Sequence, residues 1–228
     1  SPASLTFTEN NWNTAQTVTL TGVDDTDKDR NQAFRISLYA EDQKTDNPEV
    51  STFAGSGAQG STNASGTSAT FKYPIGVAKV GNYLYVTDYN NNKIRKIVIS
   101  TGAVTTLAGS GSSGSADGTG TSASFKQPLG ITTDGTNLYV TDQFNHTIRK
   151  IVISTGAVTT FAGSPGSHGS TAGTGTSAKF YYPVGITTDG TNLYVSDHYN
   201  HRIRKIVIAT GVVSTLAGSS SGSTDATG

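Results

Sequence analysis

Short runs of alternating apolar and polar residues occupy most of this chain. Runs such as Leu138–Thr141 and Ile148–Ile153 are rich in β-branched and aromatic residues, and glycine-containing turns separate them. This pattern is typical of half-buried strands. The turn at Asp134–Asn137 begins with Asp-Gly and predicts a hairpin. No segment combines a 3.6-residue period with helix caps, so the pattern predicts an all-β chain.

The pattern recurs three times, starting at Phe71, Phe125 and Phe180. Each unit reads as four short strands, and a four-stranded unit every 40 to 55 residues or so is typical of a β-propeller blade. We therefore predict three four-stranded antiparallel blades at about 71–109, 125–164 and 180–219. The segment Ser51–Ser56 repeats the sequence of a fourth strand, which predicts a strand of a preceding blade.

Four motifs in each unit carry a family resemblance. In the second unit they are PLGI from Pro128, NLYVTD from Asn137, NHTIRKI from Asn145 and VTTFAG from Val158. Together they resemble the NHL repeat, and the resemblance covers about Ser51 to Gly228. It implies a β-propeller, commonly six-bladed, used for protein or RNA binding, for adhesion, or in some relatives for lyase or hydrolase chemistry.

The first 47 residues contain no copy of the repeat. They hold the only tryptophan, Trp12, and partly alternating runs at Thr17–Thr21 and Ala33–Leu38. This stretch resembles the C-terminal part of a Calx-beta-like or immunoglobulin-like module of large bacterial surface proteins. We therefore predict two domains, a partial β-sandwich-like module at 1–47 and the propeller at 48–228.

Three blades do not close a ring, so one blade face is expected to lack a partner. We predict that Val207-Ile208 and Val212-Val213 contribute to this face, because repeat units bury such faces against the next unit. The blades are then completed by further repeats or by another copy of the chain. The stretches Gly109–Ser124 and Gly163–Lys179 between units are predicted to be flexible surface loops, or alternatively loops that become ordered on a partner.

The composition narrows the choice of partners. Lys plus Arg and Asp plus Glu each number 16, and only 14% of residues are charged. A neutral, weakly charged chain gives no electrostatic reason to expect nucleic acid or an anionic membrane as partner. There is no cysteine, so disulfides and thiolate metal sites are excluded. No apolar run approaches the length of a membrane helix.

An Asp and an Arg recur seven residues apart in every unit. The Asp ends the second strand and the Arg belongs to the start of the third, so a hairpin brings them close. The predicted role is a partly buried structural ion pair, and the alternative is a ring of Asp side chains at the channel mouth. Asn91, Asn145 and Asn200 are predicted to be turn residues that tolerate left-handed conformations. The ion-pair residues are Asp88, Arg95, Asp142, Arg149, Asp197 and Arg204.

The loop between the second and third strands varies while its frame stays constant. Recognition commonly uses loops on a rigid scaffold, and neutral variation on an exposed turn is the alternative. Equivalent positions carry aromatic, amide, imidazole or cationic side chains in different units. The candidate ligand-binding residues at these loop tips are Tyr89, Gln143, His198, Phe144, Tyr199, His146, His201 and Arg202.

Two metal sites are conceivable. Asp25, Asp27 and Asp29 stand at alternate positions and could gather oxygen ligands around Ca²⁺, with a solvated turn as the alternative. His146, His198 and His201 could supply three imidazoles for Zn²⁺ if the blades bring them together. We identify no catalytic residues, because no Ser-His-Asp order, phosphate-binding glycine loop or paired-carboxylate site is recognisable.

The sequence leaves three functional hypotheses. The first is a non-enzymatic, extracellular or cell-surface binding or scaffold propeller of a larger bacterial protein, with a protein or carbohydrate ligand and no cofactor beyond a possible Ca²⁺. The second is a lyase or lactonase-like enzyme with a metal at the channel. The third is a subunit of an extracellular assembly in which strands from neighbouring chains complete the blades.

Overall fold

The structure, a computed structural model, describes residues 50–219 and 221–222. The chain divides into two compact units, Ser1–Pro48 and Glu49–Gly228, and the description below concerns the second. The predicted module at 1–47 and the Ca²⁺ candidates Asp25, Asp27 and Asp29 lie outside the described residues.

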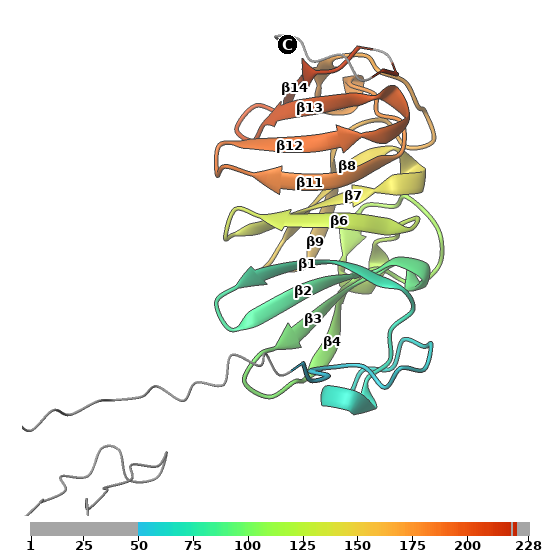
Figure 1. Cartoon of the computed structure of the whole chain (residues 1–228), viewed down its shortest axis with the longest axis vertical. Helices are drawn as coiled ribbons and strands as arrows, with labels where there is room; N and C mark the ends of the chain where they lie inside the picture. The colour runs from blue at the N-terminus through green and yellow to red at the C-terminus, as the bar shows by residue number, and fades with distance from the viewer. Residues whose placement is uncertain (1–49, 220, 223–228) are drawn as a thin grey trace, which may run out of the picture. The chain divides into compact units, whose positions relative to one another are not determined.

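Three antiparallel sheets follow one another along this unit, and we number them blades 1 to 3 (Figure 1). Blade 1 contains β1 (Pro74–Val80), β2 (Tyr83–Asp88), β3 (Lys93–Val98) and β4 (Val104–Ala108). Blade 2 contains β5 (Gly118–Thr119), β6 (Pro128–Thr133), β7 (Asn137–Asp142), β8 (Thr147–Val152) and β9 (Ala157–Ala162). Blade 3 contains β10 (Gly173–Thr174), β11 (Pro183–Thr188), β12 (Asn192–Asp197), β13 (Arg202–Val207) and β14 (Val212–Ala217).

The only helical elements among the described residues are short 3₁₀ turns, so the all-β prediction is confirmed. We count the four longer strands of each blade as first to fourth and leave out the two-residue strands β5 and β10. In each blade, one of the 3₁₀ turns connects the second strand to the third. The six turns are η1 (Gly66–Ser68), η2 (Tyr89–Asn91), η3 (Gly120–Ser122), η4 (Gln143–Asn145), η5 (Gly175–Ser177) and η6 (His198–Asn200). Within the described part of the chain, no helix is long and apolar enough to cross a membrane.

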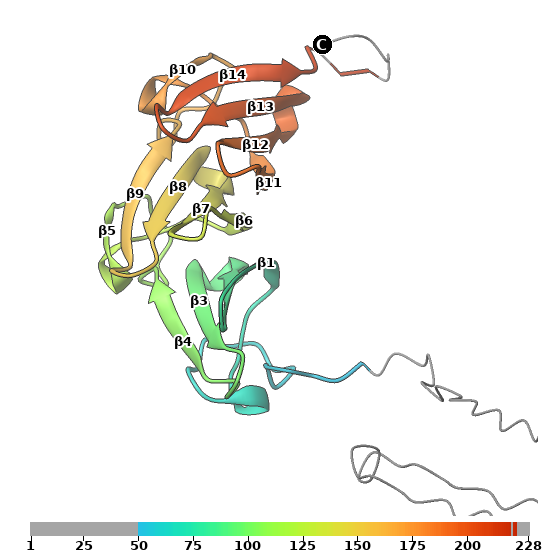
Figure 2. The ribbon, with the colours of Figure 1, turned by 90° about the vertical axis from the view of Figure 1, so that its left-hand side faces the viewer.

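The first strands of the three blades, β1, β6 and β11, lie side by side (Figures 1 and 2). The hydroxyl of Thr87 on β2 donates a hydrogen bond of 2.7 Å to the carbonyl of Leu129 on β6. A Cβ at Gly76 would lie 2.6 Å from that same carbonyl oxygen. The Pro-x-Gly motif therefore contains glycine because the next blade approaches the backbone here. Thr141 repeats the contact in blade 2, donating to the carbonyl of Val184 at 2.8 Å.

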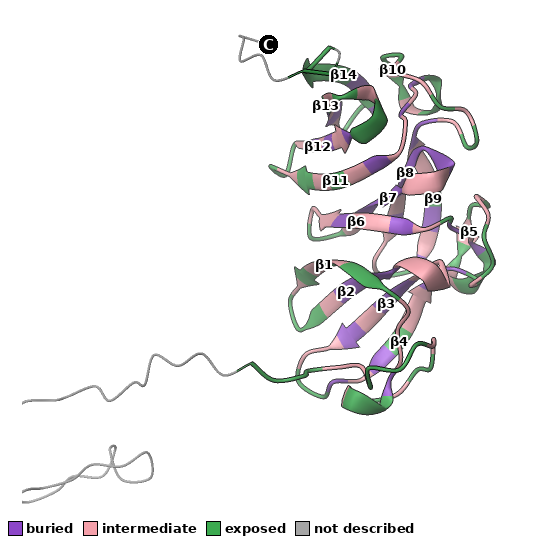
Figure 3. Ribbon diagram, turned by 45° about the vertical axis from the view of Figure 1, so that its right-hand side comes forward, coloured by how far each residue is buried: buried purple, intermediate pink, exposed green. Residues whose placement is uncertain are grey.

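The two largest hydrophobic clusters lie between the blades, at surfaces that we call junction 1/2 and junction 2/3. At junction 1/2, Tyr85 and Ile94 of blade 1 pack with Phe125, Leu138 and other residues of blade 2. At junction 2/3, equivalent residues of blades 2 and 3 form a second cluster around Phe180. Figure 3 shows that buried residues occur on the strands of all three blades. Such burial between neighbours supplies most of the stability of a repeat array.

The phenylalanine before each blade seals a junction where a preceding blade is present. Phe125 and Phe180 are fully buried, whereas Phe71 is only half-buried. The same difference appears at Val77, which is 62% exposed, and its equivalent Ile131, which is 7% exposed. The first side of blade 1 is therefore only partly covered. Ala54, Ala64 and Phe71 of the segment before the blade pack against a small buried cluster that includes Val86 and Ile97, and Val77 stays exposed.

The last side of blade 3 is open. Leu216 is 48% exposed and Val212 and Ile203 are also exposed. The prediction for this face is partly wrong, because Val213 is buried toward blade 2 and Val207 and Ile208 are half-buried. Alternation along β14 explains the difference, since neighbouring residues point to opposite faces of the sheet.

Two predictions about the connections need correction. Ser51–Ser56 does not form a strand, because no described strand lies beside it to share a ladder. The stretches between blades are not merely surface loops. Each includes a short strand, β5 or β10, that pairs with the fourth strand of the blade it enters.

Candidate functional site

A buried ion pair occurs at the same place in every blade. The Asp–Arg distances are 2.8 Å between Asp88 Oδ2 and Arg95 Nη1, 3.0 Å in blade 2 and 2.9 Å in blade 3. All six side chains are fully buried. Buried carboxylates that are paired in this way cannot line a channel mouth, so the alternative of an exposed Asp ring is wrong for these blades.

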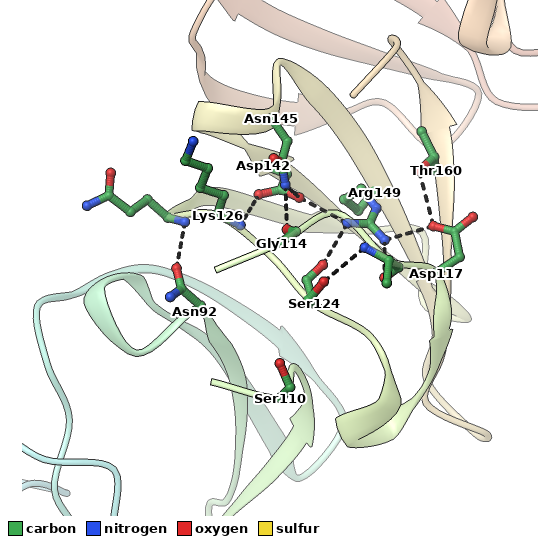
Figure 4. A network of polar contacts seen from close by, with 12 residues as sticks. Asn92, Ser110, Gly114, Asp117, Ser124, Lys126, Asp142, Asn145, Arg149 and Thr160 are labelled. Atoms are coloured by element: carbon green, nitrogen blue, oxygen red, sulfur yellow. Dashed lines mark hydrogen bonds and ion pairs between the residues drawn. The ribbon is translucent and has the colours of Figure 1, made fainter. Parts of the chain in front are cut away.

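The pair also holds the connection between blades, as Figure 4 shows for blade 2. Asp142 accepts hydrogen bonds from the backbone N–H of Lys126 at 2.7 Å and from Asn145 Nδ2 at 2.7 Å. Arg149 donates to the carbonyls of Ser124 at 2.9 Å and Ala116 at 3.0 Å. These partners lie in the segment that the sequence suggested as a loop, so the pair fastens that segment to the blade.

The carboxylate of the buried pair keeps its charge at neutral pH even though burial disfavours that charge. Burial raises the pKa of Asp142 to about 6, although the hydrogen bonds from Asn145 and Lys126 and the charge of Arg149 act in the opposite direction. The carboxylate is therefore ionised at neutral pH. The guanidinium of Arg149 also lies 5.1 Å from the ring centroid of Phe125, a cation–π distance. Arg149 therefore contacts both Asp142 and the phenylalanine that seals the junction, and the role of the ion pair is structural.

The loop ends of the blades are formed by η2, η4 and η6. The residue after each turn is left-handed: Asn92 at φ 52°, His146 at φ 60° and His201 at φ 55°. The preceding asparagines lie in the 3₁₀ turns, as their predicted role as turn residues requires, while the left-handed position is the residue after each of them. Their amides donate to the ion-pair aspartates and to a glycine carbonyl of the preceding loop, as Asn145 does to Gly114 at 2.7 Å.

At junction 1/2 the loop ends meet through amides. Gln127 donates from its backbone N–H to Asn92 Oδ1 at 2.9 Å, and from its side chain to Asn90 Oδ1 at 3.1 Å. Figure 4 includes the first of these bonds, at Asn92. The Tyr89 hydroxyl also donates to Gln143 Oε1 at 3.1 Å, which joins the tips of blades 1 and 2.

At junction 2/3 the equivalent positions carry rings. Tyr182 takes the place of Gln127, and its backbone N–H donates to Nδ1 of His146 at 3.2 Å. Ring centroids of Phe144 and Tyr182 are 4.9 Å apart, and those of His146 and Tyr182 are 4.7 Å apart. We call the connected rings the aromatic cluster: Phe144, His146, His168, Tyr181, Tyr182, His198 and Tyr199.

The structure thus places the predicted loop residues in different settings. Phe144, His198 and Tyr199 join the cluster near the surface, but His146 is only 7% exposed and is not a loop tip. Burial lowers the pKa of His146, and the neighbouring His168 and Lys126 lower it further, which favours a neutral imidazole. A neutral ring can accept the hydrogen bond at Nδ1.

Sequence reasoning missed three members of the cluster, Tyr181, Tyr182 and His168. A signal was present: the third unit reads Phe-Tyr-Tyr from Phe180, where the first two read Phe-Lys. The proposed imidazole set for Zn²⁺ does not assemble. Among the residues that the structure describes, no three His, Cys, Asp or Glu side chains gather as a metal site would require.

Two pockets mark the open sides. One, of about 870 Å³, is lined by Phe71, Tyr73 and the segment around Gly55. The other, of about 270 Å³, is lined by His201, Arg202 and other residues at the loop end of blade 3. At junction 1/2, Gly109 lies close both to the backbone of residues 92–93 of blade 1 and to the ring of Phe125. Each pocket therefore corresponds to one half of a junction. The first contains the phenylalanine but not the start of a third strand, and the second contains the start of a third strand but no phenylalanine.

Comparison with known proteins identifies the repeat. Residues 180–206 match the family model of the NHL repeat. The chain is 33% identical to human NHL repeat-containing protein 2 over 72% of its own length and 25% of that protein. It is 32% identical to the Arabidopsis thaliana protein SUPPRESSOR OF QUENCHING 1, chloroplastic, over 70% of this chain and 16% of that one. The chain spans a quarter or less of these relatives.

Solved structures agree on the fold. A Bacteroides thetaiotaomicron protein of unknown function has a TM-score of 0.52 and 28% identity, over 64% of this chain and 36% of that one. A B. thetaiotaomicron auxiliary nutrient binding protein has a TM-score of 0.50 and 25% identity, over 59% of this chain and 35% of that one. The described residues therefore have the fold of β-propeller blades, and residues 180–206 match the NHL repeat.

Proposed function

We propose that this chain is a non-enzymatic binding module whose recognition surface is the loop end of its blades. One observation carries the proposal. The same backbone frame, held by the same buried ion pair, presents amides at junction 1/2 and aromatic rings at junction 2/3. Stability alone requires only one kind of side chain at these loop-end positions. A recognition surface, in contrast, gains from different side chains on a rigid scaffold.

The proposed setting is an extracellular or cell-surface protein of a bacterium, acting in adhesion or in assembly. Two observations support it: the resemblance of residues 1–47 to a surface module, and the likeness to a Bacteroides protein described as an auxiliary nutrient binding protein. Relatives of the repeat also occur in human and plant proteins, so the repeat is not restricted to bacteria.

The proposal can be tested with two charge-matched variants. The loop-end variant carries Gln143→Arg and His198→Arg, and the far-end variant carries Thr136→Arg and Thr191→Arg in the hairpin turns at the opposite end of the blades. Both would be screened with the unaltered chain on an array of glycans and extracellular proteins. We expect the loop-end variant alone to lose the ligands that the unaltered chain binds. Equal binding by both variants would contradict a loop-end surface.

A second function, completion of the blades by another blade, is favoured by the two pockets. Gly55 packs on Phe71 without the start of a third strand, and Gly218 packs on His201 and Arg202 without a phenylalanine. At junctions 1/2 and 2/3 all of these parts are present together. We propose that further repeats or another copy of the chain cover the open sides of blades 1 and 3.

Sedimentation of the chain at increasing concentration tests the second-copy form of this proposal. Leu216→Asp places a charge on the open side of blade 3, and Thr215→Asp, also an exposed position on β14, is the matched control. We expect association that Leu216→Asp abolishes and Thr215→Asp keeps. A monomer whose amides are protected from hydrogen exchange throughout 203–216 would show that the open side needs no cover.

A further inference from the structure

Three tyrosines of the aromatic cluster contact one another near the surface, and we call them the tyrosine triad. The ring centroids of Tyr181, Tyr182 and Tyr199 lie 5.0 to 5.2 Å from one another, with interplanar angles of 32° to 50°. Tyr199 is 55% exposed, and the other two are half-buried. The triad therefore offers ring surface to solvent while its members brace one another.

The fold does not require tyrosine at these positions. The backbone bond from Tyr199 N–H to the Tyr181 carbonyl, 3.1 Å, has the same geometry as that from Phe144 N–H to the Lys126 carbonyl, 3.2 Å. In blade 2 the positions of Tyr181 and Tyr182 hold lysine and glutamine, and blade 2 is equally well formed. Tyr182 adopts φ 53°, and its equivalents Tyr73 and Gln127 adopt φ 54° and 57°. This left-handed conformation therefore belongs to the backbone frame of every blade, and it does not depend on tyrosine.

Polar groups surround the exposed rings. His168 stacks on Tyr181 with centroids 4.4 Å apart and an interplanar angle of 21°. His198 meets Tyr199 edge-on at 5.0 Å. Both imidazoles are exposed. Phenol and imidazole groups each donate and accept hydrogen bonds, so the surface combines apolar faces with polar edges.

The charge at this place differs from that of the other blades. The residue after the sealing phenylalanine is Lys72 in blade 1 and Lys126 in blade 2, but Tyr181 in blade 3. A surface for nucleic acid or another polyanion would gain affinity from lysine here. Replacement of the lysine by an aromatic ring favours a neutral ligand.

We propose that the tyrosine triad binds a neutral saccharide, an inference that rests on the proposed function and specifies its ligand. A sugar ring has a face of C–H bonds that can lie against the negative face of an aromatic ring. Its hydroxyl groups can exchange hydrogen bonds with His168, His198 and the tyrosine hydroxyls. A neutral saccharide therefore matches both the apolar faces and the polar edges of this surface.

The test uses the whole chain and a variant designed from its own first two blades. Tyr181→Lys, Tyr182→Gln and Tyr199→Asn together introduce residues that blades 1 and 2 carry at these positions. Tyr73→Gln is the matched control, because Tyr73 is an exposed equivalent of Tyr182 outside the cluster. The probes are soluble starch, xylan, mannan and a β-glucan in affinity gel electrophoresis, with polygalacturonate and single-stranded RNA as anionic probes.

We expect at least one neutral polysaccharide to retard the unaltered chain and the Tyr73→Gln control. The triple variant should bind it at least about tenfold more weakly, with a melting temperature close to that of the unaltered chain. Undiminished binding by the triple variant, retardation by the anionic probes alone, or no retardation at all would overturn the saccharide proposal.

These failures are distinguishable from failure of the proposed function. If no polysaccharide is bound but the loop-end variant loses a protein ligand on the array, the saccharide inference is wrong and the binding module stands. If the array shows no ligand that depends on the loop end, both are wrong.

Discussion

Junctions 1/2 and 2/3 have the same buried interior but differ at the loop ends of the blades, which we call the rim of each junction. Both bury a phenylalanine beside an arginine, at 5.1 Å for Phe125 and Arg149 and 5.2 Å for Phe180 and Arg204. At the rim, amides at junction 1/2 give way to rings at junction 2/3. The comparison separates what the fold needs from what it only tolerates, because features present at both junctions are structural and those present at one are free to serve recognition.

The largest expected effect is loss of the shared ion pair. Arg149→Ala leaves Asp142 buried without its cation, which costs about 3 to 5 kcal/mol of unfolding free energy. Lys150→Ala removes a side chain that is only half-buried and is the control. Thermal unfolding of the two variants measures the difference. Equal melting temperatures would show that the pair is not part of the common frame.

The phenylalanine seals should come next. Phe125→Ala and Phe180→Ala each remove a fully buried ring and should cost about 3 to 5 kcal/mol. Phe71→Ala should cost clearly less, because Phe71 is only half-buried on the open side of blade 1. Denaturant titration gives the three values. A Phe71→Ala cost equal to the other two would mean that this side is covered in solution.

Hydroxyl hydrogen bonds from the second strand of one blade to the first strand of the next make a smaller contribution to stability at both junctions. Thr141→Val removes the 2.8 Å bond to the Val184 carbonyl and should cost about 1 kcal/mol. Ser196 in blade 3 bonds Gly185 of its own blade, so Ser196→Ala should cost less. If both substitutions destabilise the chain equally, the carbonyl of a further blade accepts from Ser196 as well.

The rim substitution is expected to have little effect on stability. Tyr182→Gln introduces the residue found at the equivalent position of junction 1/2. It removes contacts of a ring that is only half-buried and keeps the backbone N–H bond to His146. The unfolding free energy should change by no more than about 1 kcal/mol. A larger loss, measured by denaturant titration against Tyr73→Gln, would assign the aromatic cluster a structural role and weaken the binding proposal.

The smallest effect concerns acid stability and a turn that blade 1 lacks. Burial alone would raise the pKa of Asp134, but hydrogen bonds from Asn137, Thr136 and Tyr139 lower it below its usual value. Because the folded pKa is the lower one, this stabilisation is present above about pH 4 and is lost as the pH falls through the folded pKa. Asp134→Asn should flatten the acid limb of a stability–pH curve, whereas Val80→Asn, at the equivalent position of blade 1, should not.

Much of the fold was readable in the sequence because blades are built from local pattern. Strand alternation, the Asp-Gly hairpin turn and the recurrence of Asp and Arg seven residues apart indicated four strands per blade and a pair between two neighbouring strands. These features depend on contacts within one hairpin, which sequence spacing encodes directly.

Contacts between blades were decided only by the tertiary structure. The inter-blade stretches looked like flexible loops because glycine and serine carry no apolar pattern. Their role comes from backbone carbonyls, such as those of Ala116 and Ser124, that accept from Arg149. Backbone groups leave no mark in the residue types, so this role was not visible in advance.

The aromatic cluster shows the same division. The sequence by itself determined which blade carries rings, since Tyr181, Tyr182 and Tyr199 are all in the third unit. Only the fold decided that they touch one another, that they meet Phe144 of blade 2, and that His146 is buried beneath them while Tyr199 remains exposed. Residues of two units far apart in the chain become neighbours because blade stacking, not sequence distance, sets their positions.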